Sequence, residues 1–207
     1  MPRFLRSAQN VKREDLHELQ YITPIENVAS IMANGLLSHN GVQRLGHARI
    51  DMREAQDRRA PKRVPNGLPI HDYVNLYICA RNPMLYKRRG LHERICVLAV
   101  APDVLDLPGA VVADQNVASN YVRFAEAPAG LAIVDRDMTF ARNWTHPLDQ
   151  IAEWRHKAMK CAEILVPNRV DANYIVKAYV SGEAPRVALI GCGVTLPVEV
   201  TRDLFFL

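Results

Sequence analysis

Short apolar runs separated by turn-forming residues dominate the chain, and these runs predict strands. Residues 95–100 are almost continuously apolar, which predicts a central strand buried on both faces. Residues 73–79 are rich in β-branched and aromatic side chains and lie between Pro69 and Asn82, so they predict another strand. Further strands are expected at 19–22, at 111–114 and around 163–166, and a β-hairpin at 174–180 and 186–190.

Helices are fewer, and one of them has clear end signals. Thr23 as N-cap, Pro24 at the first helical position and Glu26 three residues after the cap form a capping box, and Gly35 closes the helix. Shorter helical segments are expected at 51–60, at 82–86, at 102–105 and after 145–147.

The strands outnumber the helices and do not alternate strictly with them, which predicts an α+β fold around a mixed sheet. A chain of 207 residues, 49% of them hydrophobic, can bury one good core, so a single domain spanning 1–207 is expected. The pattern is ambiguous between 116 and 146, where residues 119–124 fit either a strand or a helix. Neither the dinucleotide-binding glycine pattern nor the P-loop pattern occurs.

Composition narrows the class of protein. The four cysteines form no C-x-x-C pair and the seven histidines show no zinc-binding spacing, so reduced cysteines and no metal centre are expected. The N-terminal residues lack the apolar stretch of a signal peptide, and no run approaches the roughly 20 apolar residues of a membrane span. These features predict a soluble cytoplasmic protein that does not bind a membrane.

Positive charge is concentrated in one stretch. Residues 44–63 hold seven Lys and Arg against three Asp and Glu, an excess equal to the whole chain's net charge of +4. Gly and Pro interrupt the region from 37 to 69, which predicts a long surface loop. Such loops are usually functional or disordered, so both a role in binding and a merely solvated loop remain open.

One carboxylate interrupts an apolar run. Glu163 lies between Ala162 and the Ile-Leu-Val sequence at 164–166, where a charge is costly unless something pairs with it or uses it. It is either a strand residue that points to solvent or an acid at the floor of a cleft.

Several segments, taken in order, resemble one known family. They are residues 21–23, Asn27, 56–59, 71–74, 81–86 and 162–166. The most specific pieces are H-D-Y-V at 71–74, R-N-P-M-L-Y at 81–86 and A-E-I-L-V at 162–166. Together they resemble the DarT family, bacterial toxins that use NAD to ADP-ribosylate bases in single-stranded DNA. The resemblance runs from about Leu19 to the C-terminal strands and implies an ADP-ribosyltransferase fold with a long basic loop over NAD.

The resemblance implies two catalytic residues. Glu163 matches the glutamate that holds the ribose hydroxyls of NAD and stabilises the oxocarbenium-like charge, and Arg59 matches the family's essential arginine. The chemistry suits these residue types, because cleavage of the N-glycosidic bond builds positive charge that a fixed carboxylate stabilises. An arginine also offers bidentate contact to a pyrophosphate. Glu163 is therefore expected to project into a cleft beside Thr23 and Arg59.

The same resemblance assigns two binding sets. The cofactor set, for NAD, is Tyr21, Ile22, Thr23, Asn27, Gly35, Leu36, Arg58, Arg59 and Tyr77. The substrate set is Arg49, Arg53, His71, Tyr73, Met84, Tyr86, Arg88, Arg89 and Trp144. Its basic residues are expected to track phosphates, and Tyr86, Tyr121 or Trp144 to stack on an exposed base. A solvated hairpin tip remains the alternative for 87–89. The chain departs from many family members at Tyr21, where they carry His, so the contacts made there stay open.

The implied function is modification of a base in single-stranded DNA, because an enzyme that reacts with a base atom needs that base outside the stack. Thymine is favoured and guanine is possible. The implied partner is an antitoxin, an ADP-ribosylglycohydrolase of macrodomain or NADAR type, and the protein is expected to be a monomer. Transfer to RNA or protein, and a non-catalytic module that binds NAD or nucleic acid, remain alternatives.

Overall fold

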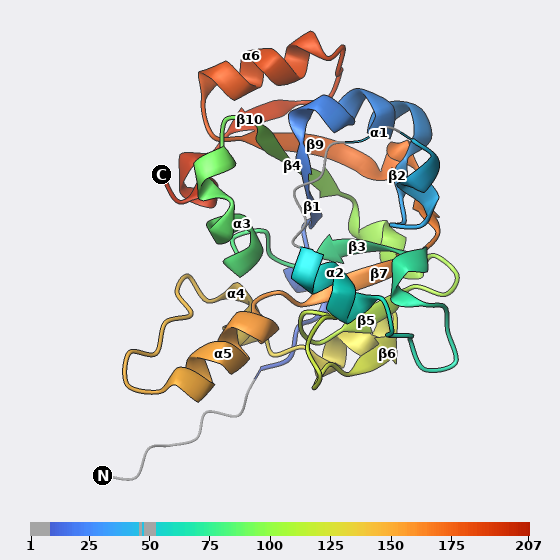
Figure 1. Cartoon of the computed structure of the whole chain (residues 1–207), viewed down its shortest axis with the longest axis vertical. Coiled ribbons are helices and arrows are strands. Elements are labelled where there is room, and N and C mark those ends of the chain that lie inside the picture. Colours follow the sequence, from blue (N-terminus) through green and yellow to red (C-terminus); the bar gives the residue numbers. More distant parts are fainter. Residues whose placement is uncertain (1–8, 46, 48–52) are drawn as a thin grey trace.

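A computed structural model describes residues 9–45, 47 and 53–207. Eight strands form one sheet in the order β10-β9-β4-β1-β3-β7-β5-β6, and β2 and β8 form a second, two-stranded sheet (Figure 1). Neighbouring strands of the large sheet are antiparallel except for β9 and β10, which are parallel. The strands are β1 Leu19–Pro24, β2 Leu36–Leu37, β3 Tyr73–Tyr77, β4 Ile95–Val100, β5 Val111–Ala113, β6 Phe124–Glu126, β7 Glu163–Pro167, β8 Arg169–Val170, β9 Ile175–Val180 and β10 Val198–Val200.

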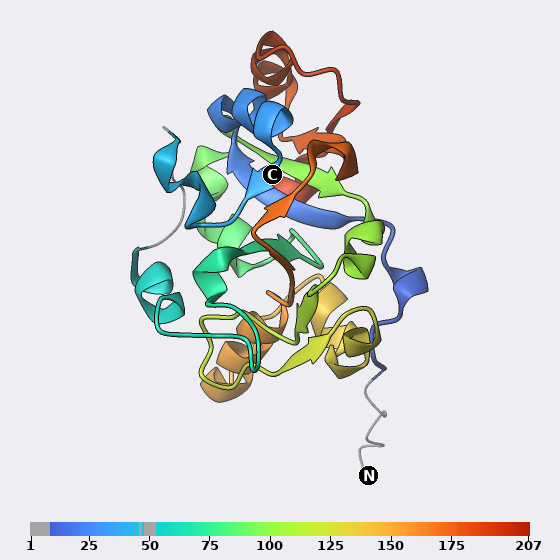
Figure 2. The ribbon, with the colours of Figure 1, turned by 90° about the vertical axis from the view of Figure 1, so that its right-hand side faces the viewer.

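The α-helices are short and lie around the sheet. They are α1 Val28–Asn34, α2 Arg53–Arg59, α3 Pro83–Lys87, α4 Arg136–Phe140, α5 Gln150–Met159 and α6 Glu183–Gly191. Helices α1 and α6 lie at the β9–β10 end of the sheet, whereas α4 and α5 lie toward its β5–β6 end (Figures 1 and 2). Single 3-10 turns join many of the elements. In the described residues, no helix is long and apolar enough to cross a membrane.

The core forms along β4, as its composition predicts. All six residues of β4 are buried, because the strand lies inside the sheet with apolar side chains packed on both faces. Strand β1 pairs with β4 through six successive residues, from Leu19↔Val100 to Pro24↔Ile95. This continuous ladder fixes the position of β1.

Strands β1 and β3 separate soon after they meet. In the described chain they share the single registered pair Gln20↔Tyr77, whereas β3 and β7 pair through five residues, ending at Tyr77↔Glu163. The C-terminal half of β1 therefore diverges from the N-terminal half of β3. This divergence opens the sheet where the candidate site lies.

The capping box predicted at Thr23 is wrong. Thr23 and Pro24 remain in β1, where Thr23 pairs with Cys96, and a 3-10 turn at Ile25–Asn27 precedes α1. The extended ladder with β4 outweighs the local capping signal. The predicted end of the helix at Gly35 is confirmed.

The predicted C-terminal hairpin is also wrong. The first strand forms as β9, but residues 186–190 belong to α6, and the strand that pairs with β9 is β10, in parallel. A parallel neighbour needs a crossover connection, and α6 provides it. The ambiguous region 119–124 is largely irregular, with β6 beginning at Phe124.

Candidate active site

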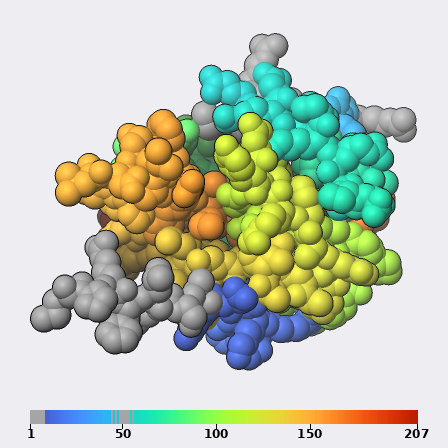
Figure 3. Space-filling model, turned by 90° about the horizontal axis from the view of Figure 1, so that it is seen from below, coloured from blue at the N-terminus to red at the C-terminus, as the bar shows by residue number. Residues whose placement is uncertain are grey.

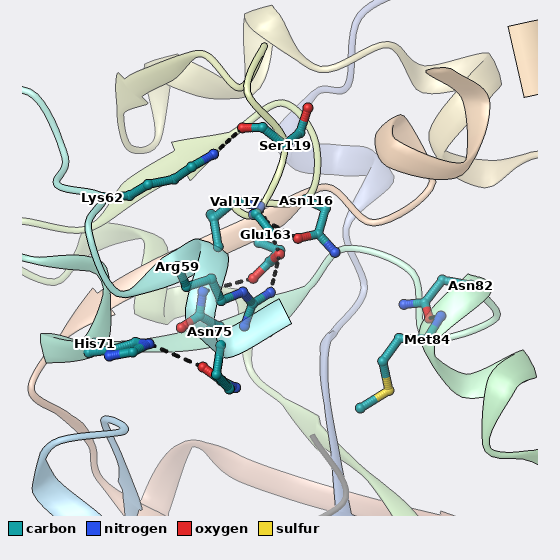
Figure 4. A network of polar contacts seen from close by, with 12 residues as sticks. Arg59, Lys62, His71, Asn75, Asn82, Met84, Asn116, Val117, Ser119 and Glu163 are labelled. Atoms are coloured by element: carbon teal, nitrogen blue, oxygen red, sulfur yellow. Dashed lines mark hydrogen bonds and ion pairs between the residues drawn. The ribbon is translucent and has the colours of Figure 1, made fainter. Parts of the chain in front are cut away.

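Glu163 is the first residue of β7 and lies inside the sheet between Tyr77 of β3 and Ala113 of β5. Its side chain is fully buried, which is costly for a carboxylate unless its oxygens are satisfied. Three donors satisfy them. Arg59 Nη2 donates to Oε1 at 2.8 Å, Asn75 Nδ2 donates to Oε2 at 2.7 Å, and the Val117 backbone N–H donates to Oε1 at 3.2 Å (Figure 4).

Arg59 reaches this carboxylate from the end of α2, the helix that lies in front of β3 and β7 in Figure 1. Its side chain is 12% exposed. Burial by itself lowers the Arg59 pKa, but the negative charge of Glu163 and the adjacent Tyr77 phenol outweigh burial and raise it. Arg59 Nε is buried and has no hydrogen-bond partner among the described residues.

Asn75 and Tyr77 project from the same face of β3, because they are two residues apart in one strand. Tyr77 is directly opposite Glu163 in the β3–β7 ladder. Burial, together with the Glu163 carboxylate, raises the Tyr77 pKa far above its ordinary value, so the phenol is neutral and can donate. Burial and the same carboxylate raise the pKa of the neighbouring Cys161 thiol to about 12.

The loop after β5 supplies the backbone donor. Asn116 anchors this loop by donating its N–H to the Ala158 carbonyl at 3.0 Å. On the other side, Lys62 donates to the Ser119 carbonyl, which ties the loop to the segment after α2 (Figure 4). The space-filling view from below shows the two segments, yellow-green and cyan, side by side (Figure 3). These anchors hold the Val117 N–H against Glu163.

A cleft opens on Arg59, Asn75 and Tyr77 where β1 and β3 diverge. Glu163 lies behind Arg59 and Asn75, on the cleft side of the sheet but shielded from solvent. Ten residues that the sequence analysis assigned to NAD or substrate line the cleft: Tyr21, Ile22, Thr23, Asn27, Gly35, Arg59, His71, Tyr73, Tyr77 and Met84. Thr23 and Arg59 line the cleft and Arg59 contacts Glu163, whereas the Glu163 side chain itself is buried and does not line it.

One wall of the cleft depends on a glycine. Gly35 has φ +79°, and a Cβ there would lie 2.4 Å from the Val170 carbonyl oxygen. Only glycine fits this conformation and this approach of two backbones. Nearby, Asn27 Nδ2 donates to Thr23 Oγ1 at 3.4 Å, which joins the start of α1 to the end of β1.

The opposite wall carries histidines. His71 makes a 3.1 Å hydrogen bond to Gln56 of α2, and its ring contacts the His39 ring in a tilted arrangement, with centroids 4.3 Å apart. The contact between His71 and Gln56 holds α2 against the 3-10 turn before β3.

Several assigned residues lie elsewhere. Leu36 is fully buried in β2, and Arg58 is exposed and does not line the cleft. Tyr86 and Trp144 line a second pocket on α3, and Trp144 is 8% exposed, so it packs as core and is not an open stacking surface. Arg49 lies outside the described residues, and only the backbone of Arg53 is described.

Arg88 and Arg89 contact α3 itself. Arg88 is buried and donates to the Met84 carbonyl at 3.4 Å, whereas Arg89 lies 4.2 Å from the centre of the Tyr86 ring. The segment 87–89 is therefore partly packed against the helix and is not a fully solvated tip.

Sequence reasoning missed the cleft residues Asn75, Gln56 and His39, and the Val117 N–H. Asn75 carried a usable signal, since a polar residue between Val74 and Leu76 interrupts an apolar strand as Glu163 does. A backbone donor such as the Val117 N–H has no sequence signature.

The arrangement provides a fixed negative charge, a cation beside it and a cleft that reaches the cation, with the carboxylate buried directly behind it. Arg59 Nε is buried without a partner in the described chain, so a ligand of the cleft can satisfy this donor only when Arg59 shifts. Arg59, Asn75 and Tyr77 thus fit an anionic nucleotide with ribose hydroxyls. Among the described residues, no group of three His, Cys, Asp or Glu side chains is placed to hold a metal ion.

Residues 20–206 match the family model described as "ssDNA thymidine ADP-ribosyltransferase, DarT". A DNA ADP-ribosyl transferase–DNA ADP-ribosyl glycohydrolase fusion protein of Thermosipho africanus is 31% identical over 176 residues, which cover 79% of this chain and 42% of the fusion protein. A DNA ADP-ribosyl transferase of Thermus sp. 2.9 is 32% identical over 164 residues, covering 72% of this chain and 73% of the relative.

Solved structures agree in fold. Thermosipho africanus DarTG in complex with ADP-ribose superposes with a TM-score of 0.78 at 26% identity, covering 92% of this chain and 51% of that one. Thermus sp. 2.9 DarT in complex with ADP-ribosylated ssDNA superposes with a TM-score of 0.81 at 23% identity, covering 95% and 99%. The chain thus spans about half the length of the fusion protein. The α+β ADP-ribosyltransferase fold and the family resemblance are confirmed.

Proposed function

This chain belongs to the DarT family, and on that premise we propose that it is an NAD-dependent ADP-ribosyltransferase that modifies a base in single-stranded DNA. The observation that carries the proposal is the fully buried Glu163, held by Arg59, Asn75 and Val117 beside a cleft where the sheet opens. The two relatives described as DNA ADP-ribosyl transferases support it.

In the proposed reaction, the bond between C1′ of the NAD ribose and the nicotinamide nitrogen breaks, and nicotinamide leaves with the electron pair. A base nitrogen then donates its lone pair to C1′ and loses its proton. The products are ADP-ribosylated DNA, nicotinamide and one proton. Positive charge develops on the ribose as the first bond breaks, so a carboxylate already fixed in position stabilises the transition state more than the ground state.

Each buried residue has a role in this proposal. Glu163 holds the ribose hydroxyls and faces the developing charge, and Arg59 fixes that carboxylate and donates its unpartnered Nε to NAD. Asn75 orients the second carboxylate oxygen. Binding of NAD requires Arg59 or Asn75 to give up part of its contact with Glu163, because both shield the carboxylate from the cleft.

We further propose thymine as the modified base, in keeping with the description of the family model, with guanine as the alternative. A toxin role with a glycohydrolase antitoxin also belongs to the proposal, and the fused relative, which carries a DNA ADP-ribosyl glycohydrolase, supports it. A macrodomain or NADAR antitoxin, a single domain, a monomeric state and a cytoplasmic location remain predictions.

The test is incubation of the purified protein with NAD labelled in its adenylate part, in parallel with single-stranded DNA, duplex DNA, RNA and a protein mixture. Label is expected on single-stranded DNA, and mass spectrometry of homopolymer oligonucleotides should place it on oligo(dT). Label on RNA or on protein would show that the acceptor is not single-stranded DNA. Binding of DNA without NAD consumption would favour a non-catalytic module.

A further inference from the structure

A second pocket lies on the other side of α3 from the cleft. Met84 of α3 lines the cleft, whereas its neighbours Pro83 and Tyr86 line the second pocket. The other walls come from α5 and from the chain around Arg142. A single five-residue helix thus separates the two depressions.

The pocket is built around aromatic rings. Tyr86, Trp144 and Phe206 contact one another edge to face, with ring centroids 5.1 to 5.9 Å apart. This cluster is rigid, because Trp144 is nearly buried and each ring fixes the others. At the rim, Trp154 of α5 is 62% exposed and Tyr86 is 41% exposed.

An exposed Trp beside a rigid aromatic wall is not explained by packing. Trp154 forms part of the pocket lining but leaves most of its surface in water, where burying it would be favourable. A flat ligand that stacks on the indole would remove this area from water, and every nucleobase offers such a face.

The charge of the lining selects for an anion. Arg81, Lys87, Arg142 and Lys157 line the pocket, and none of its lining residues in the described part of the chain is a carboxylate. Two carboxylates lie close by. Asp203 pairs with Arg142 at 2.6 Å and with Arg81 at 3.6 Å, and Glu153 pairs with Lys157 at 2.5 Å. Two acids against four bases leave the pocket positive, which suits the phosphate of a nucleotide.

We propose that this pocket binds a nucleotide next to the acceptor base in the same DNA strand. The indole of Trp154 stacks on that base, and the lining cations contact its phosphates. The inference rests on the proposed function, since it places the acceptor base in the cleft. Two base sites on either side of α3 would make transfer depend on the neighbouring base as well as on the acceptor.

The test compares Trp154→Ala with Ile151→Ala. Ile151 is one turn earlier on α5 and 60% exposed, and it does not line the pocket. Fluorescence anisotropy with a labelled single-stranded 12-mer should show about tenfold to hundredfold weaker binding for Trp154→Ala, the effect of losing one base–aromatic stack. Ile151→Ala should bind like the natural protein, and Trp154→Phe should recover most of the affinity. NAD binding, measured by calorimetry without DNA, should be equal in all four proteins.

Tryptophan emission gives a second readout. The chain has two tryptophans, so Trp144→Phe leaves Trp154 as the only reporter. Its emission should be quenched when single-stranded oligonucleotide is added, and a peptide of mixed sequence should leave it unchanged.

Two failures are distinguishable. If Trp154→Ala binds DNA as tightly as the natural protein and still transfers ADP-ribose, the pocket is not a nucleotide site, but the proposed function stands. Quenching of Trp154 by the peptide and not by the oligonucleotide would lead to the same conclusion. Trp154-dependent DNA binding by a protein that transfers no ADP-ribose would keep the pocket as a nucleotide site and overturn the proposed function.

Discussion

Arg59 and Glu163 lie 104 residues apart in the chain and form a buried 2.8 Å ion pair between helix α2 and strand β7. The pair joins the end of the basic segment around α2 to the first residue of β7, so the segment with the most concentrated charge is fixed to the strand with the buried carboxylate. A buried pair of this kind contributes little net stability, but removal of one partner leaves an uncompensated charge. Both the fold around the cleft and the proposed chemistry therefore depend on these two side chains.

Replacement of Glu163 by Gln should abolish transfer, and it should also lower stability because buried Arg59 loses its negative partner. The amide keeps one acceptor oxygen for Arg59, but it carries no negative charge to stabilise the developing positive charge on the ribose. The rate of transfer to single-stranded DNA should fall by about 100-fold or more, the effect of removing one preorganised electrostatic group. Steady-state rates with labelled NAD and far-UV circular dichroism during urea denaturation measure the two properties. Transfer at the natural rate by Glu163→Gln would remove Glu163 from the mechanism.

Arg59→Lys should impair transfer although it keeps the positive charge. Lysine cannot hold the Glu163 carboxylate and also present the Nε donor, which is buried and has no other partner in the described chain. The adjacent Arg58 is exposed and does not line the cleft, so Arg58→Lys is the matched control. We expect a loss of about tenfold or more in kcat/KM for Arg59→Lys only. Equal activity of the two variants would contradict the role of Arg59.

Asn75 should stabilise the buried Glu163 carboxylate, as Arg59 does. Asn75→Ala removes the 2.7 Å hydrogen bond to Glu163 Oε2, at a cost of about 1.5–3 kcal/mol for a bond to a charged group. Asn75→Asp is nearly the same size but places a second carboxylate against the first, so its loss of stability at pH 8 should exceed that of Asn75→Ala. Urea denaturation of both variants at pH 8 measures the difference. A more stable Asn75→Asp would show that Asn75 does not face the carboxylate.

Two strands of the core were predictable from short apolar runs rich in β-branched residues. Residues 95–100 and 164–166 have this composition, and both form buried strands. Residues 186–190 were misassigned because a short apolar run fits a strand or a buried helix equally well. Thr23 satisfied a capping rule, but six residues of pairing with β4 determined its conformation. In each error, tertiary contacts outweighed a correct local signal.

The site was predictable only where side chains carry its chemistry. Arg59 and Glu163 belong to ordered motifs, and the structure brings them into contact. Trp144, which was expected to stack on DNA, is nearly buried, whereas Trp154 is exposed, and no local sequence pattern distinguishes the two tryptophans. Trp144 is buried because α3 packs against the C-terminal turn, and this long-range contact cannot be read from the sequence around Trp144.

Gly35→Ala should destabilise the protein far more than an ordinary glycine substitution. The new Cβ would face both a left-handed backbone and the Val170 carbonyl at 2.4 Å, so α1 and β8 must move apart. Gly90→Ala is the control, since a Cβ there meets nothing within 4 Å and its φ is not in the left-handed range. Thermal and urea unfolding should give a loss of about 2 kcal/mol or more for Gly35→Ala and at most about 0.5 kcal/mol for Gly90→Ala. Equal losses would show that β8 does not pack against Gly35.

The stability of the protein should also fall as the pH drops below about 6.5, because of His156 on α5. His156 Nε2 donates to the Met138 carbonyl at 3.1 Å, so in the neutral ring Nδ1 accepts from His146 at 2.9 Å. Burial lowers the His156 pKa below its ordinary value of 6.5, and the nearby His146 and Lys160 lower it further, against the raising effects of Met138 and Asp135.

The direction of this pH dependence follows from the number of protons that the folded and unfolded chains bind. Between the lowered folded pKa and 6.5, the unfolded chain binds more protons at this residue than the folded chain does. The free energy of unfolding should therefore rise with pH across this window and reach its full His156 contribution above 6.5. Urea denaturation at pH steps from 5 to 8 measures the slope. His156→Gln keeps a donor for the Met138 carbonyl but does not titrate, so its slope should be smaller. An unchanged slope in His156→Gln would assign the pH dependence to other groups.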